Sequence, residues 1–383
     1  MQSSKKMSKS RGIIITINVR WWNAEAAYAI NLARGLILKG HNIHLLVNKD
    51  SPVHLKALDY NIPVISDIKL DSFSLIKQLS NLRKILKYIE QYNIQIIHSF
   101  KSNGSFLFSI ARYLKPQLLH IRTRGEARPP KNHFLNRLSY EKKSCDGVIS
   151  VGDIVKTGIK KLNAEIDHFE TIYYGDSPVQ FKPDLNRINQ PLFKNLSPAT
   201  ITMALVGRTQ DIKGHQIALK ALAKIKNLKI HLFFFVKDLE EYPKELIVLK
   251  EIIEDEQLGG QVTITDFLPD LGDTLSFVDF GIIPSLASEV NCRVAVEFFS
   301  LAKPVIVFPT GSLPEVVKHE VSGLVCSHKT SDSLAESIQT MANQCDFRAK
   351  LAENAFLEYQ TRFSLSVLAD KTLNFYKKCT PQS

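Results

Sequence analysis

The stretch from Pro284 to Gly323 most constrains the fold of this 383-residue chain. An apolar run over 280–283 is followed by a Pro-Ser pair, a polar loop and a helical segment. A second apolar run, over 304–308, then ends in a Pro-Thr-Gly turn. This order of strand, loop, helix, strand and loop is typical of a parallel α/β sheet. Ligands of such sheets bind outside the carboxyl ends of the strands, so the loops after both runs are candidate binding loops.

Two carboxylates in this stretch are eight residues apart, Glu289 and Glu297. If Glu289 opened the helix, eight residues would span a little over two turns, and both side chains could face one site. Carboxylates are strong acceptors for neighbouring hydroxyl groups. A bare pair of glutamates is more often a solvated helix face, so the flanking sequence has to decide between the two interpretations.

The flanking sequence points to a known family. Over 284–325, Pro-Ser…Glu-x7-Glu…Lys-Pro-Val-Ile…Gly…Pro-Glu-Val-Val…Ser-Gly-Leu-Val resembles the donor-site block of retaining glycosyltransferases of family 4. The resemblance implies the GT-B fold, with two Rossmann-like parallel-sheet domains facing across a cleft. It implies a nucleotide-diphosphate sugar as donor substrate, and we expect no other cofactor. It puts Glu289 on the transferred sugar and Glu297 on the ribose. The following turn supplies further donor-site candidates, with backbone N–H groups as added donors: Gly311, Ser312, Leu313 and Glu315.

A basic pair follows another strand-like run. The run over 201–206 leads into Gly207-Arg208, and Lys213 comes five residues after Arg208, before a helix. The pair resembles the family's Arg-x4-Lys contacts to the donor diphosphate. Fixed cations there would stabilise the charge that develops on a leaving diphosphate. No Asp-x-Asp motif occurs, so we expect no catalytic divalent metal and assign no metal ligand.

Strand-like runs alternate with helical patterns along the whole chain, which favours two α/β domains with mostly parallel sheets. We expect an acceptor-side domain over 1–190 and a nucleotide-sugar-binding domain over 191–360. By the family's pattern, a C-terminal helix over 361–383 crosses back to the first domain. The remaining expected strands are 13–19, 42–47, 62–68, 94–100, 118–123, 147–151, 169–173, 229–236, 261–267 and 323–326.

Three positions in the first half are acceptor or catalytic candidates. Where the family usually has a glycine-rich turn after the first strand, this chain has Trp-Trp-Asn-Ala. Trp22 could form a stacking wall for a sugar or could simply pack, and Asn23 beside it is also a good helix N-cap. His98, at a strand end, is a candidate for the reaction centre, although a lone histidine there is more often structural.

A cationic loop over 120–137 is broken by Gly125 and by a Pro-Pro pair. It carries Arg122, Arg124 and Arg128, and guanidinium groups bind phosphate or carboxylate through paired donors. Many family members have a histidine near this position. This chain offers Thr123, Arg124 or Glu126 there, which leaves that role open. A second family resemblance, Tyr-Gly-Asp at 174–176 with Phe-x-Pro at 181–183, leads into a polar linker over 186–200.

The positive charge is concentrated in the first half. Residues 1–190 hold 29 Lys/Arg and 15 Asp/Glu, a net +14, whereas residues 191–383 hold 20 and 23, a net −3. This asymmetry predicts an anionic or lipid-linked glycan acceptor, such as a lipopolysaccharide or other envelope glycan, and peripheral contact with an anionic membrane. The helical segment over 73–92 carries four Lys/Arg beside Leu and Ile. It could lie on a membrane surface, but a solvated helix packed on a core is the interpretation we favour.

The composition bears on the cellular location and on the alternative functions. Five cysteines without a Cys-x-x-Cys pair fit a reducing cytoplasm, and we expect the protein there, at the inner face of the cytoplasmic membrane. We predict a metal-independent, retaining glycosyltransferase. One alternative is a sugar-nucleotide epimerase on the same fold. The other is a non-enzymatic anion- or nucleic-acid-binding protein, suggested by a pI of about 9.2. We expect no nucleic-acid partner, because nucleic-acid binding would not need two glutamates beside Arg208 and Lys213.

Overall fold

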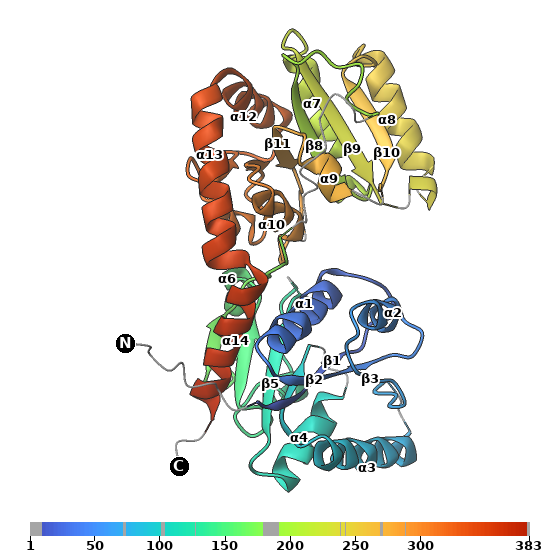
Figure 1. Cartoon of the computed structure of the whole chain (residues 1–383), viewed down its shortest axis with the longest axis vertical. Helices are drawn as coiled ribbons and strands as arrows, with labels where there is room; N and C mark the ends of the chain where they lie inside the picture. The colour runs from blue at the N-terminus through green and yellow to red at the C-terminus, as the bar shows by residue number, and fades with distance from the viewer. Residues whose placement is uncertain are drawn as a thin grey trace. The chain divides into compact units, whose positions relative to one another are not determined.

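The computed structural model describes residues 10–380 except 72–73, 101–103, 127, 179–190, 238, 242, 269–270 and 288. The chain forms two compact units. Unit 1 runs to Gly175 and resumes at Leu365, and unit 2 spans 176–364. The boundaries therefore lie at 175/176 and 364/365, where we expected 190/191 and 360/361. Each unit is an α/β domain built on one parallel sheet (Figure 1), which confirms the predicted pair of Rossmann-like domains.

Unit 1 contains a seven-stranded sheet in the order β3-β2-β1-β4-β5-β6-β7. Every strand pair in it is parallel. Its strands are β1 (Gly12–Ile17), β2 (Asn42–Val47), β3 (Val64–Ile65), β4 (Ile94–Ser99), β5 (Leu119–Arg124), β6 (Gly147–Ser150) and β7 (Phe169–Thr171). Its helices are α1 (Ala24–Leu38), α2 (Pro52–Asp59), α3 (Leu75–Gln91), α4 (Ser105–Leu114), α5 (Phe134–Leu138), α6 (Asp153–Lys160) and α14 (Leu365–Cys379).

Unit 2 contains a six-stranded parallel sheet in the order β10-β9-β8-β11-β12-β13. Its strands are β8 (Ile201–Gly207), β9 (Ile230–Val236), β10 (Val262–Asp266), β11 (Phe280–Ile283), β12 (Val305–Val307) and β13 (Gly323–Val325). Its helices are α7 (His215–Lys224), α8 (Pro243–Asp255), α9 (Leu271–Leu275), α10 (Arg293–Ser300), α11 (Leu313–Val316), α12 (Ser331–Asn343) and α13 (Cys345–Glu358), with short 3₁₀ turns at Asp211–Lys213 and Leu239–Glu241 and a π-helical turn at Tyr359–Phe363.

Most predicted strands lie within two residues of the observed ones, because runs of β-branched residues buried on both faces have few alternatives in a parallel sheet. The expected strand over 62–68 is much shorter, since only Val64 and Ile65 pair with β2. The helix expected over 73–92 is α3, whose N-cap Ser74 accepts a hydrogen bond from the backbone N–H of Lys77. The predicted Phe-x-Pro segment and the start of the predicted linker lie outside the described residues.

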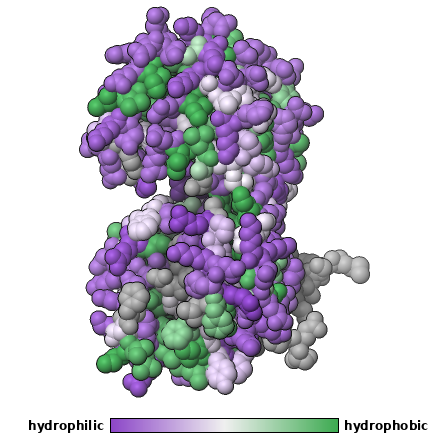
Figure 2. All heavy atoms as spheres, turned by 180° about the vertical axis from the view of Figure 1, so that it is seen from behind, coloured by the Kyte–Doolittle hydropathy of each residue, from purple (hydrophilic) through white to green (hydrophobic). Residues whose placement is uncertain are grey.

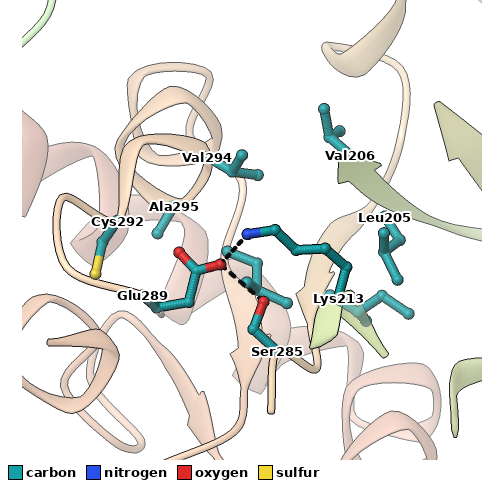
Figure 3. A pocket seen from close by; sticks show the side chains of 10 residues that line it. Leu205, Val206, Lys213, Ser285, Glu289, Cys292, Val294 and Ala295 are labelled. Atoms are coloured by element: carbon teal, nitrogen blue, oxygen red, sulfur yellow. Dashed lines mark hydrogen bonds and ion pairs between the residues drawn. The ribbon is translucent and has the colours of Figure 1, made fainter. Parts of the chain in front are cut away.

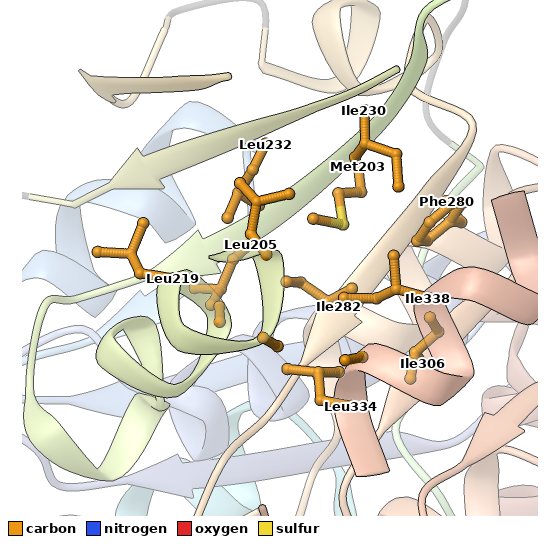
Figure 4. Close-up of a cluster of buried hydrophobic side chains, with 14 of the residues drawn as sticks. Met203, Leu205, Leu219, Ile230, Leu232, Phe280, Ile282, Ile306, Leu334 and Ile338 are labelled. Atoms are coloured by element: carbon orange, nitrogen blue, oxygen red, sulfur yellow. The ribbon is translucent and has the colours of Figure 1, made fainter. Parts of the chain in front are cut away.

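The sheet of unit 2 is stabilised by a core of buried apolar side chains. Apolar side chains of the central strands pack against α7 and α12 on one face of the sheet (Figure 4). Each such buried side chain contributes roughly 1.5–3 kcal/mol to folding. The labelled members are Met203, Leu205, Leu219, Ile230, Leu232, Phe280, Ile282, Ile306, Leu334 and Ile338.

Helix α14 packs on unit 1 although it lies at the other end of the sequence (Figure 1). It buries a stripe at helical spacing that includes Leu365, Leu368, Phe375 and Tyr376. Gly35 of α1 allows the close approach, because a Cβ there would lie 3.0 Å from the Leu365 carbonyl oxygen. The C-terminal segment is therefore part of the core of unit 1.

Two histidines are enclosed in the core of unit 1. The ring nitrogens of His98 lie 2.6 Å from the hydroxyl of Tyr376 and 2.6 Å from that of Thr123. The ring of His120 contacts the Ser99 hydroxyl at 3.0 Å and the Ser144 carbonyl oxygen at 2.8 Å. Burial lowers the pKa of each imidazole to about 3. Both side chains are therefore neutral in the folded protein near pH 7.

This burial predicts that unit 1 loses stability as the pH falls below 6.5. An unfolded histidine protonates near 6.5, whereas His98 and His120 stay neutral in the fold. Above pH 6.5 both histidines are neutral in the folded and in the unfolded state, so the stability does not depend on pH. Below pH 6.5 the unfolded state binds protons that the folded state does not, and the stability falls. Each histidine then costs about 1.4 kcal/mol per pH unit. Both tryptophans, Trp21 and Trp22, belong to unit 1, so fluorescence-detected urea unfolding between pH 7.5 and 5.5 measures the loss.

The matched control is His328→Asn, which replaces an exposed histidine of unit 2 and should leave the pH profile of unit 1 unchanged. A stability of unit 1 that stays constant from pH 7.5 to 5.5 would show that the two rings are not held neutral.

Candidate functional site

The sheet of unit 2 has one point where the strand order reverses. From β8 the chain proceeds outward through β9 and β10, and it returns to the other side of β8 with β11. The loops after β8 and β11 therefore diverge at the carboxyl edge and leave a crevice between them. The two loops are hydrogen-bonded, because the backbone N–H of Leu286 donates to the Ile212 carbonyl oxygen at 2.8 Å.

Lys213 and Glu289 meet in this crevice. The Lys213 ammonium forms an ion pair with the Glu289 carboxylate. The Ser285 hydroxyl donates to the same carboxylate at 2.8 Å (Figure 3). The three side chains line a pocket of about 300 Å³, part of which is open to solvent. Thus the structure brings together two residues predicted from separate motifs, 76 positions apart.

A glycine in each neighbouring loop fixes the position of this pair. Gly311 has φ +59°, and a Cβ at this position would lie 1.7 Å from the Glu289 carbonyl oxygen. The next residue, Ser312, donates its backbone N–H to that same oxygen at 2.8 Å. Gly214 has φ +78°, and a Cβ there would lie 2.2 Å from the Pro284 carbonyl oxygen. Only glycine allows the loops after β8, β11 and β12 to approach so closely.

The predicted role of the 311–313 backbone needs correction. We expected its N–H groups to be donors for the nucleotide. The N–H of Ser312 is bonded to Glu289, and that of Leu313 donates to the Thr310 carbonyl oxygen at 3.1 Å. Two of the three groups therefore serve the loop itself. Glu315 lies in the first turn of α11, and its carbonyl oxygen accepts a hydrogen bond from Arg362 at 2.9 Å.

Arg208 directly follows β8, at the same edge of the sheet as Lys213. It is partly exposed and has no ion-pair partner among the described residues. It is therefore available to an anion that enters the crevice beside Lys213. The N-terminus of α7, which begins at His215, lies directly after this segment.

Glu297 does not share one helix face with Glu289, contrary to the expectation that Glu289 opens the helix. Helix α10 begins at Arg293, and its N-cap Cys292 is in the left-handed conformation, with φ 48° and ψ 35°. Glu289 therefore lies in the preceding loop. Glu297 lies on α10 and pairs with Arg293 at 3.1 Å. Its pKa is raised by burial and by Asp176, and Arg293 partly opposes the shift.

A second pocket, of about 220 Å³, lies in unit 1 at the corresponding reversal of strand order, between β1 and β4. Glu25 of α1 is buried there, and its carboxylate accepts a hydrogen bond from the Gly125 backbone N–H at 3.0 Å. We did not predict Glu25 as a site residue; its place in the first turn of the helix that follows β1 was the available signal. The pocket is lined by Glu25, Phe100, Arg122, Thr123, Arg124, Glu126 and Tyr140.

The predicted arginine loop is held largely by its own contacts. Arg122 is buried, donates to the Ser139 carbonyl oxygen at 2.5 Å and lies over the Tyr140 ring. Arg124 pairs with Glu126 at 3.3 Å and donates to the Arg128 carbonyl oxygen at 2.5 Å. Of the three predicted arginines, only Arg128 is exposed. Arg122 and Arg124 therefore have partners within the fold, although both side chains also line the pocket of unit 1.

The other predicted residues of unit 1 are placed as follows. His98 is fully buried with both ring nitrogens engaged, so its predicted catalytic role is replaced by the structural one. The Asn23 side chain accepts a hydrogen bond from the Ala26 backbone N–H at 2.9 Å and caps α1. Trp22 is partly exposed. Neither Trp22 nor Asn23 lines the pocket of unit 1.

Among the described residues, no cluster of His, Cys, Asp or Glu side chains has the arrangement of a metal site. None of the described helices is both long enough and apolar enough to cross a bilayer.

Because Gly311 presses against Glu289, we predict that Gly311→Ala lowers the free energy of unfolding of unit 2 by more than about 2 kcal/mol. The left-handed backbone alone costs roughly 1–2 kcal/mol for alanine, and the added Cβ overlaps the Glu289 carbonyl oxygen. Urea unfolding followed by circular dichroism measures the loss, and hydrogen exchange assigns it to unit 2.

Gly259→Ala is the matched control, because a Cβ there meets nothing within 4 Å. We expect it to change stability by less than about 0.5 kcal/mol. Equal effects of the two substitutions would contradict the close loop packing.

Family models match both units. Residues 189–358 match the model described as "Glycosyl transferases group 1". Residues 26–175 match the one described as "Glycosyltransferase Family 4". Each match lies within one unit, and together the two span most of the chain.

Two curated relatives illustrate the range of similarity. An uncharacterised glycosyltransferase of Methanocaldococcus jannaschii is 26% identical over 384 residues, which is 92% of this chain and 93% of that protein. A D-inositol 3-phosphate glycosyltransferase of Mycobacterium marinum is 27% identical over 60% of this chain. The latter match spans about half of the length of that relative, 49%.

Solved structures share the fold over nearly the whole chain. A glycosyltransferase from Rickettsia africae superposes with a TM-score of 0.86 at 19% identity, covering 98% of this chain and all of that one. An Anabaena protein solved with UDP and glucose has a TM-score of 0.76 at 19% identity, covering 96% of this chain and all of that one. A lipopolysaccharide outer core galactosyltransferase has a TM-score of 0.70 at 11% identity, covering 96% of this chain and 99% of that one. The structural likenesses show the GT-B fold, and the family matches over both units indicate that the chain is a glycosyltransferase of the group 1 and family 4 type.

Proposed function

We propose that the protein transfers a sugar from a nucleoside diphosphate sugar to a hydroxyl acceptor, with retention of configuration and without a catalytic metal. The observation that carries this proposal is the Lys213–Glu289 pair in the crevice between β8 and β11. A cation and a carboxylate side by side suit a ligand that has a diphosphate at one end and hydroxyl groups at the other. Binding of such a donor would exchange the ion pair for one contact to each end.

We assign each donor contact to one of the predicted residues. Arg208 and Lys213, at the end of β8, hold the diphosphate and neutralise its charge. Glu289 accepts hydrogen bonds from hydroxyls of the transferred sugar, and Glu297, on α10, accepts those of the ribose. Glu315, in the first turn of α11, is a further donor-site residue in this proposal. The Anabaena structure with UDP and glucose, which shares the fold, supports a donor of this kind.

The reaction breaks the bond between the anomeric carbon and the diphosphate oxygen. The acceptor hydroxyl attacks that carbon on the same face, and its proton passes to the departing phosphate oxygen. The products are a glycoside and a nucleoside diphosphate. Arg208 and Lys213 stabilise the negative charge that develops on the leaving group, which is the largest demand of this step. Glu289 binds Lys213 and Ser285, so it orients the sugar in this scheme and is not a nucleophile.

We propose that the acceptor is an anionic polyol that binds unit 1 at the pocket beside Glu25. Residues 1–190 carry a net charge of +14. Arg128 and Lys131 remain exposed on the loop that follows β5. An envelope glycan and an inositol phosphate both fit this description, and relatives or structural neighbours act on each. A donor of this class implies action in the cytoplasm, where we place the protein in this proposal.

We predict that Lys213→Met and Glu297→Gln each lower kcat/KM at least tenfold while the protein stays folded. One lost charge-assisted contact costs about 1.5–3 kcal/mol, and in the transfer step the charge on the diphosphate grows. Sugar transfer is measured by release of the nucleoside diphosphate, with circular dichroism as the check on folding. Excess EDTA in the same assay should leave the wild-type rate unchanged.

The matched controls are Lys224→Met, at the far end of α7, and Glu254→Gln, on the exposed face of α8. Both should retain wild-type rates. Normal rates in Lys213→Met and Glu297→Gln would remove the donor assignment, and activity lost in EDTA and restored by Mg²⁺ or Mn²⁺ would contradict the metal-independent scheme.

A further inference from the structure

Large apolar side chains are exposed on two neighbouring helices of unit 1. In the first turns of α3, Leu75 and Ile76 are 80% and 81% exposed, and Leu79 is also exposed. On α4, Phe106, Tyr113 and Leu114 are exposed, Tyr113 by 83%. The two helices pack against each other and share one core cluster. Figure 2 shows hydrophobic residues gathered at the lower end of unit 1, the end where α3 and α4 lie in Figure 1. We call these six residues the α3–α4 surface.

Helix α4 is apolar on opposite faces. Leu107, Phe108 and Ala111 face the core of unit 1 and are buried. Phe106, seven residues before Tyr113, belongs to a second apolar stripe on the outer face. An exposed apolar stripe of this kind is a candidate interaction surface. No residue in the described part of the chain covers this outer stripe, which is therefore open to a partner.

The charge around the α3–α4 surface indicates what that cover is. Residues 74–115 hold seven Lys/Arg and one acidic residue, Glu90. Lys84 and Lys115 are paired, with Asp67 and Glu90. Lys77, Arg83 and Lys87 of α3 make no ion pair within the described residues, and all three are exposed. Unpaired cations on the helix that carries Leu75, Ile76 and Leu79 match an anionic partner with an apolar layer beneath its charges.

We propose that the α3–α4 surface docks on an anionic lipid bilayer. Leucine, isoleucine and phenylalanine side chains enter the boundary between headgroups and acyl chains, and the tyrosine lies at the headgroup level. Lys77, Arg83 and Lys87 contact lipid phosphates, where each basic residue strengthens binding about fivefold. This docking goes beyond the proposed transfer reaction and uses none of its residues. It also assigns membrane contact to α3 and α4, away from the arginine loop after β5.

The test is co-sedimentation of the full-length protein with lipid vesicles. Vesicles of phosphatidylcholine with phosphatidylglycerol should retain the wild type at low salt, and pure phosphatidylcholine vesicles should retain much less. Phe106→Ser with Tyr113→Ser should lower the partition coefficient at least about tenfold, because two buried aromatic side chains are lost. Arg83→Gln with Lys87→Gln should lower it about 30-fold, and only on the anionic vesicles.

Ile247→Ser with Val248→Ser, two exposed apolar residues of α8 in unit 2, is the control and should bind like the wild type. Binding of a nucleoside diphosphate by each variant should be unchanged, so failure of docking is distinct from failure of the transfer function. The proposal is overturned if wild type ignores anionic vesicles, or if both α3 and α4 variants bind like wild type. A wild-type dimer that Phe106→Ser and Tyr113→Ser dissociate, without vesicle binding, would instead assign the surface to a second copy.

Discussion

The candidate donor site depends on main-chain contacts between three loops at one edge of the unit 2 sheet. The Ser312 N–H bonds to the Glu289 carbonyl oxygen, and the Leu286 N–H bonds to that of Ile212. Gly311 and Gly214 adopt left-handed conformations where a side chain would strike the neighbouring loop. Polar side chains placed by rigid backbone keep their geometry before a ligand arrives, which lowers the cost of binding. The Lys213–Glu289 pair owes its position to these contacts.

The two units share one topology, but the side chains that line their pockets differ. Each sheet reverses its strand order once, and each has a pocket at that reversal. The crevice of unit 2 offers Lys213 and Glu289, which pair with each other, and Ser285 donates to Glu289. The pocket of unit 1 is lined by charges already engaged, because Arg122 and Arg124 hold the loop and Glu25 holds Gly125. This difference between the two pockets agrees with the proposal that unit 2 binds the donor firmly and that the acceptor binds unit 1 near Arg128.

The strands, and the place of Lys213 and Glu289 in loops at their carboxyl ends, could be predicted from the sequence because their signals are local. Runs such as Ile230–Val236 are buried on both faces, and loops at their carboxyl ends carry Lys213 and Glu289. The roles of His98 and Arg122 could not be predicted, because each depends on a distant partner. Tyr376 is 278 residues from His98 and joins its ring only when α14 packs on unit 1. The start of α10 was also missed, since Cys292 takes a conformation that a sequence pattern rarely signals.

The most direct test of the account is whether the crevice of unit 2 recognises a diphosphate through Lys213. Isothermal titration calorimetry can compare nucleoside diphosphates with the matching monophosphates, across the common bases, for wild type and Lys213→Met. The account predicts that one diphosphate binds wild type at least about tenfold more tightly than its monophosphate, and that Lys213→Met removes most of this difference. Equal affinities for both ligands in wild type, or a difference that persists in Lys213→Met, would contradict it.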